Sequence, residues 1–194
     1  MCKDKKSDQE LVSAFLKGNE ETLQELILRH ERKVYTSIYL LVKDRALTDD
    51  IFQETFIKVI NTLRGGHYNE EGKFISWVLR IAHNLVIDHF RGQKRMPMVR
   101  DTEEYSVFDS LHLPDGNAED RIMAEQVRNQ VRRLIDELPF EQREVVIMRH
   151  FADMSFKEIA ACTNVSINTA LGRMRYALIN LRKLVEEKQL VLVS

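Results

Sequence analysis

Apolar residues recur every three or four positions along almost the whole chain. Between residues 23 and 41 the run at this spacing is Leu23, Leu26, Ile27, His30, Val34, Ile38 and Leu41. This period is close to one helical turn, so each such segment has one apolar face. No alternation of apolar and polar residues indicates a strand. Three prolines and seven glycines in 194 residues also leave few of the residues that make hairpin turns. The sequence therefore predicts an all-α fold.

Capping signals divide this pattern into helices. Ser7 with Glu10, and Ser155 with Glu158, fit the capping box S-x-x-E. Ser166 is placed to cap a long final helix. Further expected boundaries are a cap at 48–50 for a helix that stops at 64–66, a helix over 74–90, a helix over 121–138, and Pro139 as the first residue of the next helix.

The composition changes between residues 96 and 120. Seven acids face a single base there, Arg100, and Pro97, Pro114 and Gly116 interrupt any periodicity. Such a segment has too little apolar surface to form a packed core, so we expect an acidic flexible linker. It separates two small helical domains, predicted at residues 7–95 and 121–187.

Charge and cysteine content exclude several classes of protein. A formal net charge of -1 argues against a uniformly basic nucleic-acid binder, but it allows basic residues to cluster. Two cysteines, Cys2 and Cys162, cannot build a disulfide framework or a Cys-rich metal site, and the histidines show no ligand spacing. We therefore predict no cofactor and no metal.

The N-terminal segment lacks the apolar core of a signal peptide, and no apolar run approaches the roughly 20 residues of a membrane span. We expect a cytoplasmic protein without direct membrane insertion.

The segment 155–183, SFKEIAACTNVSINTALGRMRYALINLRK, has the pattern of a helix-turn-helix. Asn164 falls where the turn needs a positive φ, which Asn tolerates. The second helix carries the bases Arg173, Arg175, Arg182 and Lys183, with no acid before Glu186. Its first half presents residues suited to base edges and phosphates: Ser166, Asn168, Thr169, Gly172 and Arg173. An ordinary helical corner with a solvated basic face is the alternative.

A second basic cluster closes the first predicted domain. Its bases are Arg80, Arg91, Lys94 and Arg95, and the aromatic residues nearby are Tyr68, Phe74, Trp77 and Phe90. Aromatic faces beside a cationic groove suit unpaired bases, and the polar loop 67–73 could recognise a flipped base by its edge. For Phe74, Trp77 and Phe90 a place in the core is the favoured alternative. Tyr68 and Asn69 are the better candidates for exposed contacts.

The helix expected to begin at 48–50 has a polar outward face. It carries Asp50, Gln53, Glu54 and Lys58, and it is acidic towards the N-terminus. Ordinary surface charge is the default explanation. On a DNA-binding protein, however, an acidic face suits a basic surface on another protein.

Together these segments resemble the extracytoplasmic-function sigma factors, a small two-domain class of bacterial RNA polymerase initiation factors. The resemblance covers nearly the whole chain. It rests on DDIFQETFIKV (49–59), FISWVLRIAHNLVIDHFR (74–91) and LPFEQREVVIMRHFADMSFKEIAACTNVSINTALGRMRYAL (138–178), arranged around the acidic linker. It implies a sigma region 2-like bundle followed by a sigma region 4-like helix-turn-helix domain.

The resemblance also implies partners and contacts. Core RNA polymerase would be bound through its β′ clamp helices and its β flap, the clamp by Asp50, Gln53, Glu54 and Lys58. Promoter -10 DNA would be bound by Tyr68, Asn69, Lys73, Asn84, Arg91, Lys94 and Arg95. The -35 element would be bound by Ser166, Asn168, Thr169, Gly172, Arg173, Arg175 and Tyr176. The linker would extend towards the RNA exit channel.

Three positions depart from the family pattern. Many relatives have Lys or Arg at Leu171, Ser at Gly172 and Arg at Tyr176, so this recognition helix is less basic than usual. Leu171 fits either a contact with a thymine methyl or a place in the core.

We therefore interpret the chain as an alternative, stress- or surface-signal-responsive sigma factor that brings polymerase to promoters and helps to melt the -10 element. The resemblance implies control by an anti-sigma factor, one that in many relatives is bound to the inner membrane. The alternative is a conventional dimeric transcription factor with an N-terminal sensor domain, but no ligand-pocket or phosphoacceptor pattern favours it. No P-loop, nucleophile elbow or H-E-x-x-H motif is present, so we predict no enzymatic activity.

Overall fold

The computed structural model describes residues 6–69, 73–93, 127 and 129–189. Its helices are α1 (Asp8–Leu16), α2 (Glu20–Val42), α3 (Arg45–Arg64), α4 (Phe74–Gln93), α6 (Phe140–His150), α7 (Phe156–Thr163) and α8 (Ile167–Glu187). Residues 129–136 are also helical. The described residues contain no strand, and the predicted all-α fold is confirmed.

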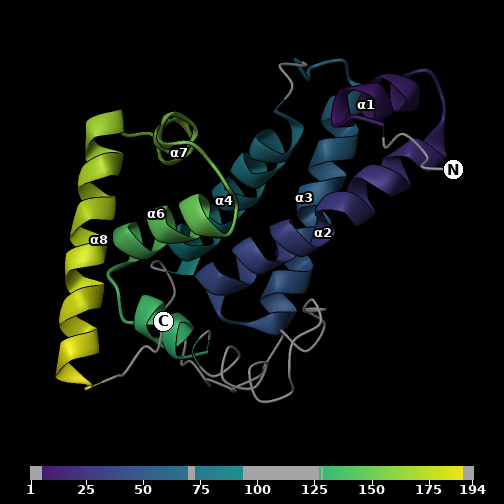
Figure 1. The fold of residues 1–194 in the computed structure, drawn as a ribbon. Helices are drawn as coiled ribbons and strands as arrows, with labels where there is room; N and C mark the ends of the chain where they lie inside the picture. The colour runs from purple at the N-terminus through teal and green to yellow at the C-terminus, as the bar shows by residue number, and fades with distance from the viewer. Residues whose placement is uncertain (1–5, 70–72, 94–126, 128, 190–194) are drawn as a thin grey trace, which may run out of the picture.

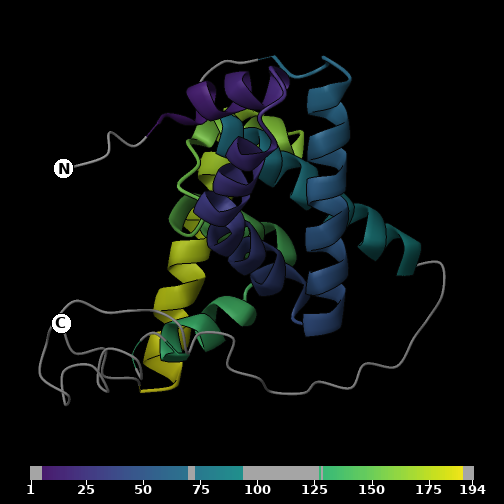
Figure 2. The same cartoon turned by 90° about the vertical axis from the view of Figure 1, so that its right-hand side faces the viewer.

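The helices form two groups that pack against each other (Figure 1). In Figure 1, α1, α2 and α3 lie on one side, α7 and α8 on the other, and α4 and α6 between them. Contacts of α2 with α6 and of α4 with α7 join the two groups. Figure 2 shows α3 and α8 again on opposite sides of the molecule.

Both predicted capping boxes are confirmed. The Ser7 hydroxyl accepts the Glu10 N–H at 3.3 Å, and the Glu10 carboxylate accepts the Ser7 N–H at 2.7 Å. The second box is equivalent: Ser155 accepts the Glu158 N–H at 3.3 Å, and Glu158 accepts the Ser155 N–H at 2.8 Å. Each box satisfies two backbone donors that a helix start leaves without partners.

The predicted start of α3 at 48–50 is wrong. Lys43 adopts a left-handed conformation (φ 58°) that ends α2, and Asp44 then caps α3 by accepting the Leu47 N–H at 2.8 Å. Thr48 lies inside the first turn of α3, where its hydroxyl donates to the Asp44 carbonyl at 2.6 Å. The polar residues at 48–50 have the composition of a cap, but the residue that caps α3 is Asp44, four residues before Thr48.

The other predicted boundaries are close to the observed ones. Helix α3 stops at Arg64, followed by Gly65, as predicted, and α4 continues three residues beyond Phe90. Pro139 is the N-cap of α6 and not its first residue, because its ψ of 145° is extended. Part of the helix predicted over 121–138 lies outside the described residues, as do the linker at 96–120, Lys94 and Arg95.

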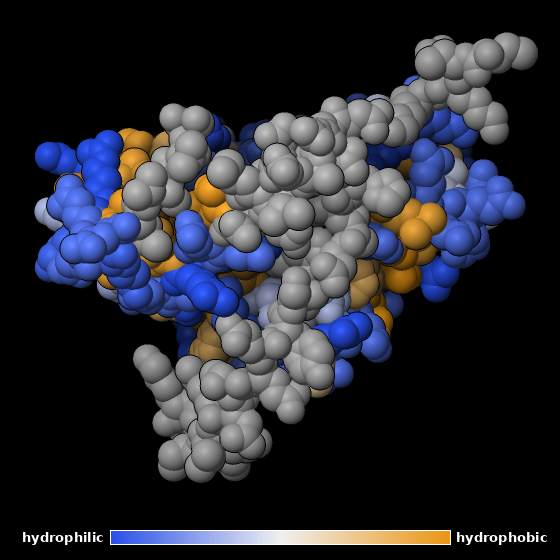
Figure 3. All heavy atoms as spheres, turned by 60° about the horizontal axis from the view of Figure 1, so that its bottom comes forward, coloured by the Kyte–Doolittle hydropathy of each residue, from blue (hydrophilic) through white to orange (hydrophobic). Residues whose placement is uncertain are grey.

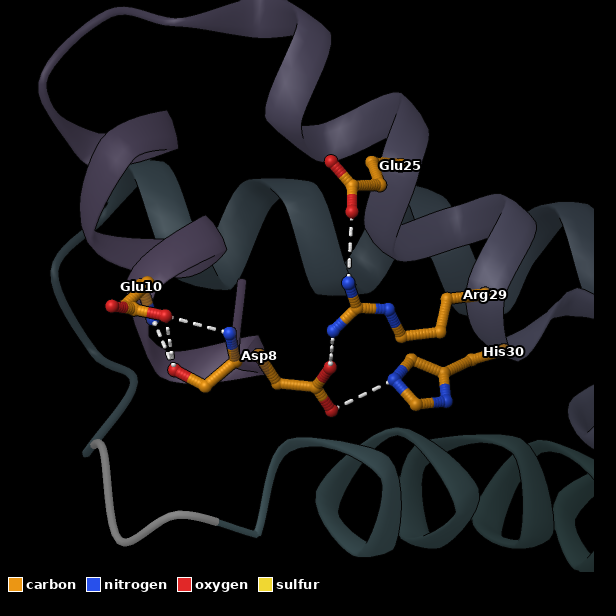
Figure 4. Close-up of polar contacts among 6 residues, drawn as sticks. Asp8, Glu10, Glu25, Arg29 and His30 are labelled. Carbon is orange, nitrogen blue, oxygen red and sulfur yellow. Dashed lines mark hydrogen bonds and ion pairs between the residues drawn. The ribbon is translucent and has the colours of Figure 1, made fainter. Parts of the chain in front are cut away.

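A polar cluster fixes α1 to α2 (Figure 4). The Asp8 carboxylate lies between two donors of α2: Arg29 Nη1 at 2.8 Å and His30 Nε2 at 2.8 Å. Arg29 also contacts Glu25 at 2.8 Å, and the His30 ring lies 5.8 Å from the ring of Phe74. The cluster thereby ties α1 to α2, and the His30 ring brings α2 against the start of α4.

Buried apolar residues form one cluster that runs through both groups of helices. It includes Leu11, Leu26 and Val59 from the first group and Ile147 and Ile159 from the second. On the face shown in Figure 3, polar side chains cover most of the described surface, and apolar side chains appear in separate areas. No helix among the described residues is long and apolar enough to cross a membrane.

Candidate functional site

Helix α3 carries the predicted polymerase-binding residues on its surface. Asp50, Gln53, Glu54 and Lys58 are all exposed, and their spacing places them on one face of the helix. Lys58 Nζ lies 3.1 Å from the Glu54 carboxylate. Ile57 shares this face and is 57 % exposed, so this polar face also has an apolar side chain. Ile57 was not predicted from the sequence, although its spacing from Gln53 and Glu54 could have identified it.

The loop before α4 is partly packed against that helix. The Tyr68 ring is half-buried and lies 4.4 Å from Trp77 and 6.1 Å from Phe74, centroid to centroid. Phe74 is 1 % exposed and belongs to the core, whereas Trp77 and Phe90 are half-buried. Of the contacts predicted in this loop, Asn69 is exposed and Tyr68 is part of an aromatic stack.

One face of α4 is polar and basic. Asn84 and Arg91 are exposed on it, and Lys73 is exposed just before the helix begins. Arg91 lies 3.4 Å from Asp88. Arg80, one turn before Asn84, is also exposed on this face. Arg80 was predicted as part of the basic cluster but not as a -10 contact, although its i, i+4 spacing from Asn84 was an available signal.

The predicted helix-turn-helix geometry is confirmed in α7 and α8. Asn164 follows α7 in a left-handed conformation, with φ 54°, and donates its N–H to the Ala160 carbonyl. Ser166 caps α8 by accepting the Thr169 N–H at 3.0 Å. Ser166, Asn168 and Thr169 are exposed at the start of α8.

Helix α8 presents different residues inward and outward. Ala170, Met174 and Ala177 are buried against the rest of the domain. Asn168, Arg175 and Tyr176 are exposed, and Gly172 lies among them with open space where a Cβ would be. Leu171 is 44 % exposed, which removes the core role considered for it.

Arg173 does not share the outward face of α8. It is partly buried, and its Nη1 lies 3.4 Å from Oε2 of Glu144 on α6. Glu144 is 3 % exposed, and its Oε1 also contacts Nε2 of His83 on α4. His83 is therefore a buried structural residue. The -35 contact predicted for Arg173 requires this side chain to leave Glu144.

Cys162 lies close to the same carboxylate. Burial, helped by the charge of Glu144 and opposed by that of Arg80, raises the pKa of its thiol to about 12. A thiol with so high a pKa is unreactive at neutral pH. Among the described residues, no group of three or more His, Cys, Asp or Glu side chains could hold a metal ion.

Comparison with known families assigns both groups of helices. The model of sigma-70 region 2 matches residues 26–96, and that of sigma-70 region 4 matches residues 128–176. The chain is 28% identical over 171 residues to the RNA polymerase sigma-H factor of Pseudomonas aeruginosa, covering 86% of this chain and 88% of that protein. It is also 28% identical over 172 residues to the ECF RNA polymerase sigma-E factor of Escherichia coli, covering 87% and 88%.

The chain belongs to the extracytoplasmic-function sigma factors. As a sigma factor it is a transcription initiation factor that binds core RNA polymerase and promoter DNA. Below, α1 to α4 are called region 2, and residues 129–136 with α6 to α8 are called region 4.

Solved structures share the fold of this sigma factor. CnrH, in complex with the cytosolic domain of CnrY, superposes with a TM-score of 0.66 at 21% identity, covering 94% of this chain and 99% of CnrH. RpoE of Bartonella quintana, in complex with the anti-sigma factor NepR, gives a TM-score of 0.65 at 17% identity, covering 84% and 96%. At these identities the likeness concerns the fold alone.

Proposed function

We propose that this sigma factor uses three separate surfaces in promoter recognition. The face of α3 that carries Asp50 binds the β′ clamp of core polymerase. The loop 67–73 and α4 bind the melted -10 strand, and α8 binds the -35 duplex. The observation that carries this proposal is that the acidic face of α3 and the outward face of α8 are both exposed, on helices at opposite sides of the molecule (Figures 1 and 2). Polymerase and duplex DNA can then contact the chain without competing for one surface.

The -10 surface combines an aromatic stack with basic side chains. Tyr68 on Trp77 offers a π face against which an unpaired base can stack. Asn69 and Asn84 are exposed amides that can form hydrogen bonds with a base edge. Arg91 is suited to the phosphate backbone, so -10 binding weakens as salt is added.

The -35 surface is the outward face of α8. Asn168 and Arg175 are exposed side chains of the kind that form hydrogen bonds with adenine and guanine edges in the major groove. Leu171 and Tyr176 are exposed beside them, and the leucine suits a thymine methyl. With an apolar residue where relatives carry a base, the -35 sequence of this chain differs from theirs.

The α3 surface suits a basic partner. Asp50 and Glu54 supply negative charge near the N-terminal half of the helix, and Ile57 supplies an apolar centre. Complementary charge accelerates and orients docking, while the apolar centre supplies binding energy.

We also propose that an anti-sigma factor controls this chain and, where that factor is membrane-bound, holds it at the inner membrane. The support is that CnrH and RpoE were solved in complexes with CnrY and NepR.

Run-off transcription tests the proposed function. Core polymerase, the purified chain and fragmented genomic DNA should yield transcripts from a limited set of promoters, and core polymerase alone should not. Specific binding of the chain to duplex operators as a dimer, without any need for polymerase, would instead support the conventional transcription factor.

A further inference from the structure

A histidine stands in the apolar face of α2. His30 follows Ile27 and precedes Val34 along that face, and its side chain is 13 % exposed. Its Nε2 lies 2.8 Å from Oδ2 of Asp8, and its ring centroid lies 5.8 Å from that of Phe74. An aliphatic side chain in this place could pack on Phe74 but could not bind Asp8. A lysine could bind Asp8 but would present no ring, so the position uses both properties of histidine.

Asp8 is a well-held acceptor for His30. It is the first residue of α1, and its other carboxylate oxygen accepts from Arg29 Nη1 at 2.8 Å (Figure 4). Arg29 is itself held by Glu25 at 2.8 Å. Because an ionised carboxylate only accepts hydrogen bonds, Nε2 of His30 is the donor. A fixed acceptor at one ring nitrogen restricts the rotation of the imidazole, so Asp8 orients the His30 ring.

Phe74 lies at the centre of a group of aromatic rings. It is the first residue of α4 and is 1 % exposed. Its ring centroid lies 5.8 Å from that of His30, 5.9 Å from that of Trp77 and 6.1 Å from that of Tyr68. All three distances fall in the range of favourable aromatic pairs. His30 contributes to this group from α2, and it therefore helps to set where the group lies relative to the rest of region 2.

The proposed -10 surface depends on the two outer rings of this group. Tyr68 and Trp77 are half-buried, with centroids 4.4 Å apart. A base stacks well on rings that are already held in place, because freedom left to the rings is lost on binding. Close-packed interiors transmit small displacements, so a shift of Phe74 moves Tyr68 and Trp77 with it.

We propose that His30 is a positioning residue for the -10 surface. Asp8 orients its ring, and the ring supports Phe74 and, through Phe74, the pair of Tyr68 and Trp77. The inference rests on the proposed function, which assigns -10 binding to this pair. Helix α1, which carries none of the proposed contacts with polymerase or DNA, thereby contributes to -10 recognition from behind the surface.

Two substitutions of His30 separate the ring from the hydrogen bond. His30→Gln keeps a donor for Asp8 and removes the ring, whereas His30→Phe keeps the ring and removes the donor. If His30 only attached α1 to α2, glutamine would be tolerated better than phenylalanine, and positioning predicts the opposite order. Binding of a single -10 strand by the holoenzyme should fall about fivefold in His30→Gln and about twofold in His30→Phe, as when the competent arrangement falls to about one fifth and about one half.

The probe is a labelled single strand that carries the -10 sequence of a promoter found by run-off transcription. Fluorescence anisotropy measures its affinity for each holoenzyme. Affinity for core polymerase should equal the wild-type value in both variants, because the exposed face of α3 is unchanged.

Trp77 supplies a spectroscopic signature of the aromatic group. It is the only tryptophan of the chain, so the fluorescence of the free protein reports on its surroundings directly. In His30→Gln the emission should shift to longer wavelength and acrylamide should quench it more strongly, because the ring pair is less tightly packed. In His30→Phe both properties should stay near the wild-type values. A loss of global stability alone does not change the emission of a chain that remains folded.

The contribution of Asp8 is tested by combining variants. Asp8→Ala removes the acceptor of His30, so -10 affinity should fall about twofold, as in His30→Phe. The double variant Asp8→Ala with His30→Phe should bind the -10 strand no more weakly than either single variant, because both changes break the same hydrogen bond. A full additional loss in the double variant would show that Asp8 does not act through His30.

Ser7→Ala is the matched control. It removes the hydroxyl that caps α1, and it leaves the side chains of Asp8, His30 and Phe74 in place. The stability of the chain in urea should fall, because α1 loses its cap. Trp77 emission and -10 affinity should nevertheless keep their wild-type values. Circular dichroism verifies that each variant is folded, and His30→Leu, which also lacks a ring, replaces His30→Gln if that variant does not fold.

Wild-type -10 affinity in the folded variant without a ring would overturn the proposal, and so would an equal loss of affinity in Ser7→Ala. Tyr68→Ala tests the proposed function separately. If this variant binds the -10 strand as tightly as the wild type, the -10 surface itself is wrongly placed, whatever His30 does to Trp77. If Tyr68→Ala weakens binding and loss of the His30 ring does not, the surface stands and the positioning role fails.

Discussion

Ile57 lies one helical turn beyond Gln53 on the exposed face of α3, with 57 % of its surface exposed. The polar residues Asp50, Glu54 and Lys58 surround it along the helix. An apolar residue at the centre of a polar rim is the usual arrangement of an interface whose binding energy is concentrated in a few side chains. We infer that Ile57 is the apolar anchor of the proposed polymerase-binding face.

Ile57→Ala should therefore weaken binding to core polymerase by about tenfold, corresponding to about 1.4 kcal/mol. The stability of the chain should change little, because the side chain is exposed. Leu28→Ala is the matched control, since Leu28 is 60 % exposed on α2, outside this face. Competition for labelled core polymerase measures both affinities. Equal affinities of the two variants would show that Ile57 is not an anchor.

Reversing the charge of the same face should abolish polymerase binding. In Asp50→Arg with Glu54→Arg, two exposed acids become cations that repel a basic partner surface. The helix should persist, because neither side chain is buried. Co-purification with core polymerase measures the effect, and Glu31→Arg, an exposed acid of α2, is the control. Normal co-purification of the double variant would place the polymerase contact elsewhere.

Two arginines of α8 should respond differently to substitution. Arg175→Ala should weaken -35 duplex binding and leave the radius of gyration unchanged, because Arg175 is exposed on the outward face. Arg173→Ala should instead destabilise the chain, because it removes a donor to the buried carboxylate of Glu144 within region 4. Loss of one phosphate contact should reduce the slope of log affinity against log salt by about 1, and loss of a base contact should cost about 1–3 kcal/mol for the cognate sequence. Mobility shifts with matched and mutated -35 duplexes distinguish a phosphate contact from a base contact.

Local chemistry explains why much of the fold could be predicted from sequence. A capping box joins residues three apart, so Ser155 and Glu158 identify a helix start without any tertiary information. The left-handed conformation of Asn164 could be predicted in the same way, because the turn between α7 and α8 needs a positive φ at this position. The start of α3 was missed because Asp44 and the polar residues after it are equally good caps, and the left-handed Lys43 decides between them.

Contacts between distant residues could not be predicted. His83 and Glu144 are 61 positions apart, and Lys33 and Asp153 are 120 apart, so no local pattern connects them. The sequence identified Arg173 as basic and correctly placed it on α8, but not the buried carboxylate beside it. The exposure of Tyr68 was overestimated for the same reason, since its stacking on Trp77 depends on how the loop packs against α4.

Two glycines should respond to alanine with opposite sign. Gly172 lies inside α8 with nothing within 4 Å of an added Cβ, so Gly172→Ala should stabilise the chain by about 0.5–1 kcal/mol. Gly66 has φ +68°, a conformation that alanine adopts only with strain, so Gly66→Ala should destabilise it by about 1 kcal/mol. Urea unfolding measures both. A loss of stability in Gly172→Ala would show that α8 is not a regular helix at this position in solution.

Alkaline pH should destabilise the chain through Cys162. Burial raises the pKa of its thiol to about 12, whereas an unfolded cysteine ionises near about 8.5. The folded state therefore keeps a proton that the unfolded state loses. The stabilising effect is complete below the unfolded pKa and is lost as pH rises towards the folded pKa. The slope approaches about 1.4 kcal/mol per pH unit, or about 2 kcal/mol between pH 8.5 and 10.

Urea unfolding at these two pH values measures the loss, and Cys162→Ala is the control because it has no thiol at this site. Lysines and tyrosines titrate in both proteins, so only the difference between them reports on Cys162. The wild-type chain should lose about 2 kcal/mol more than the variant. If both lose the same free energy, the thiol ionises as readily in the folded chain as in the unfolded one, and Cys162 is not buried in solution.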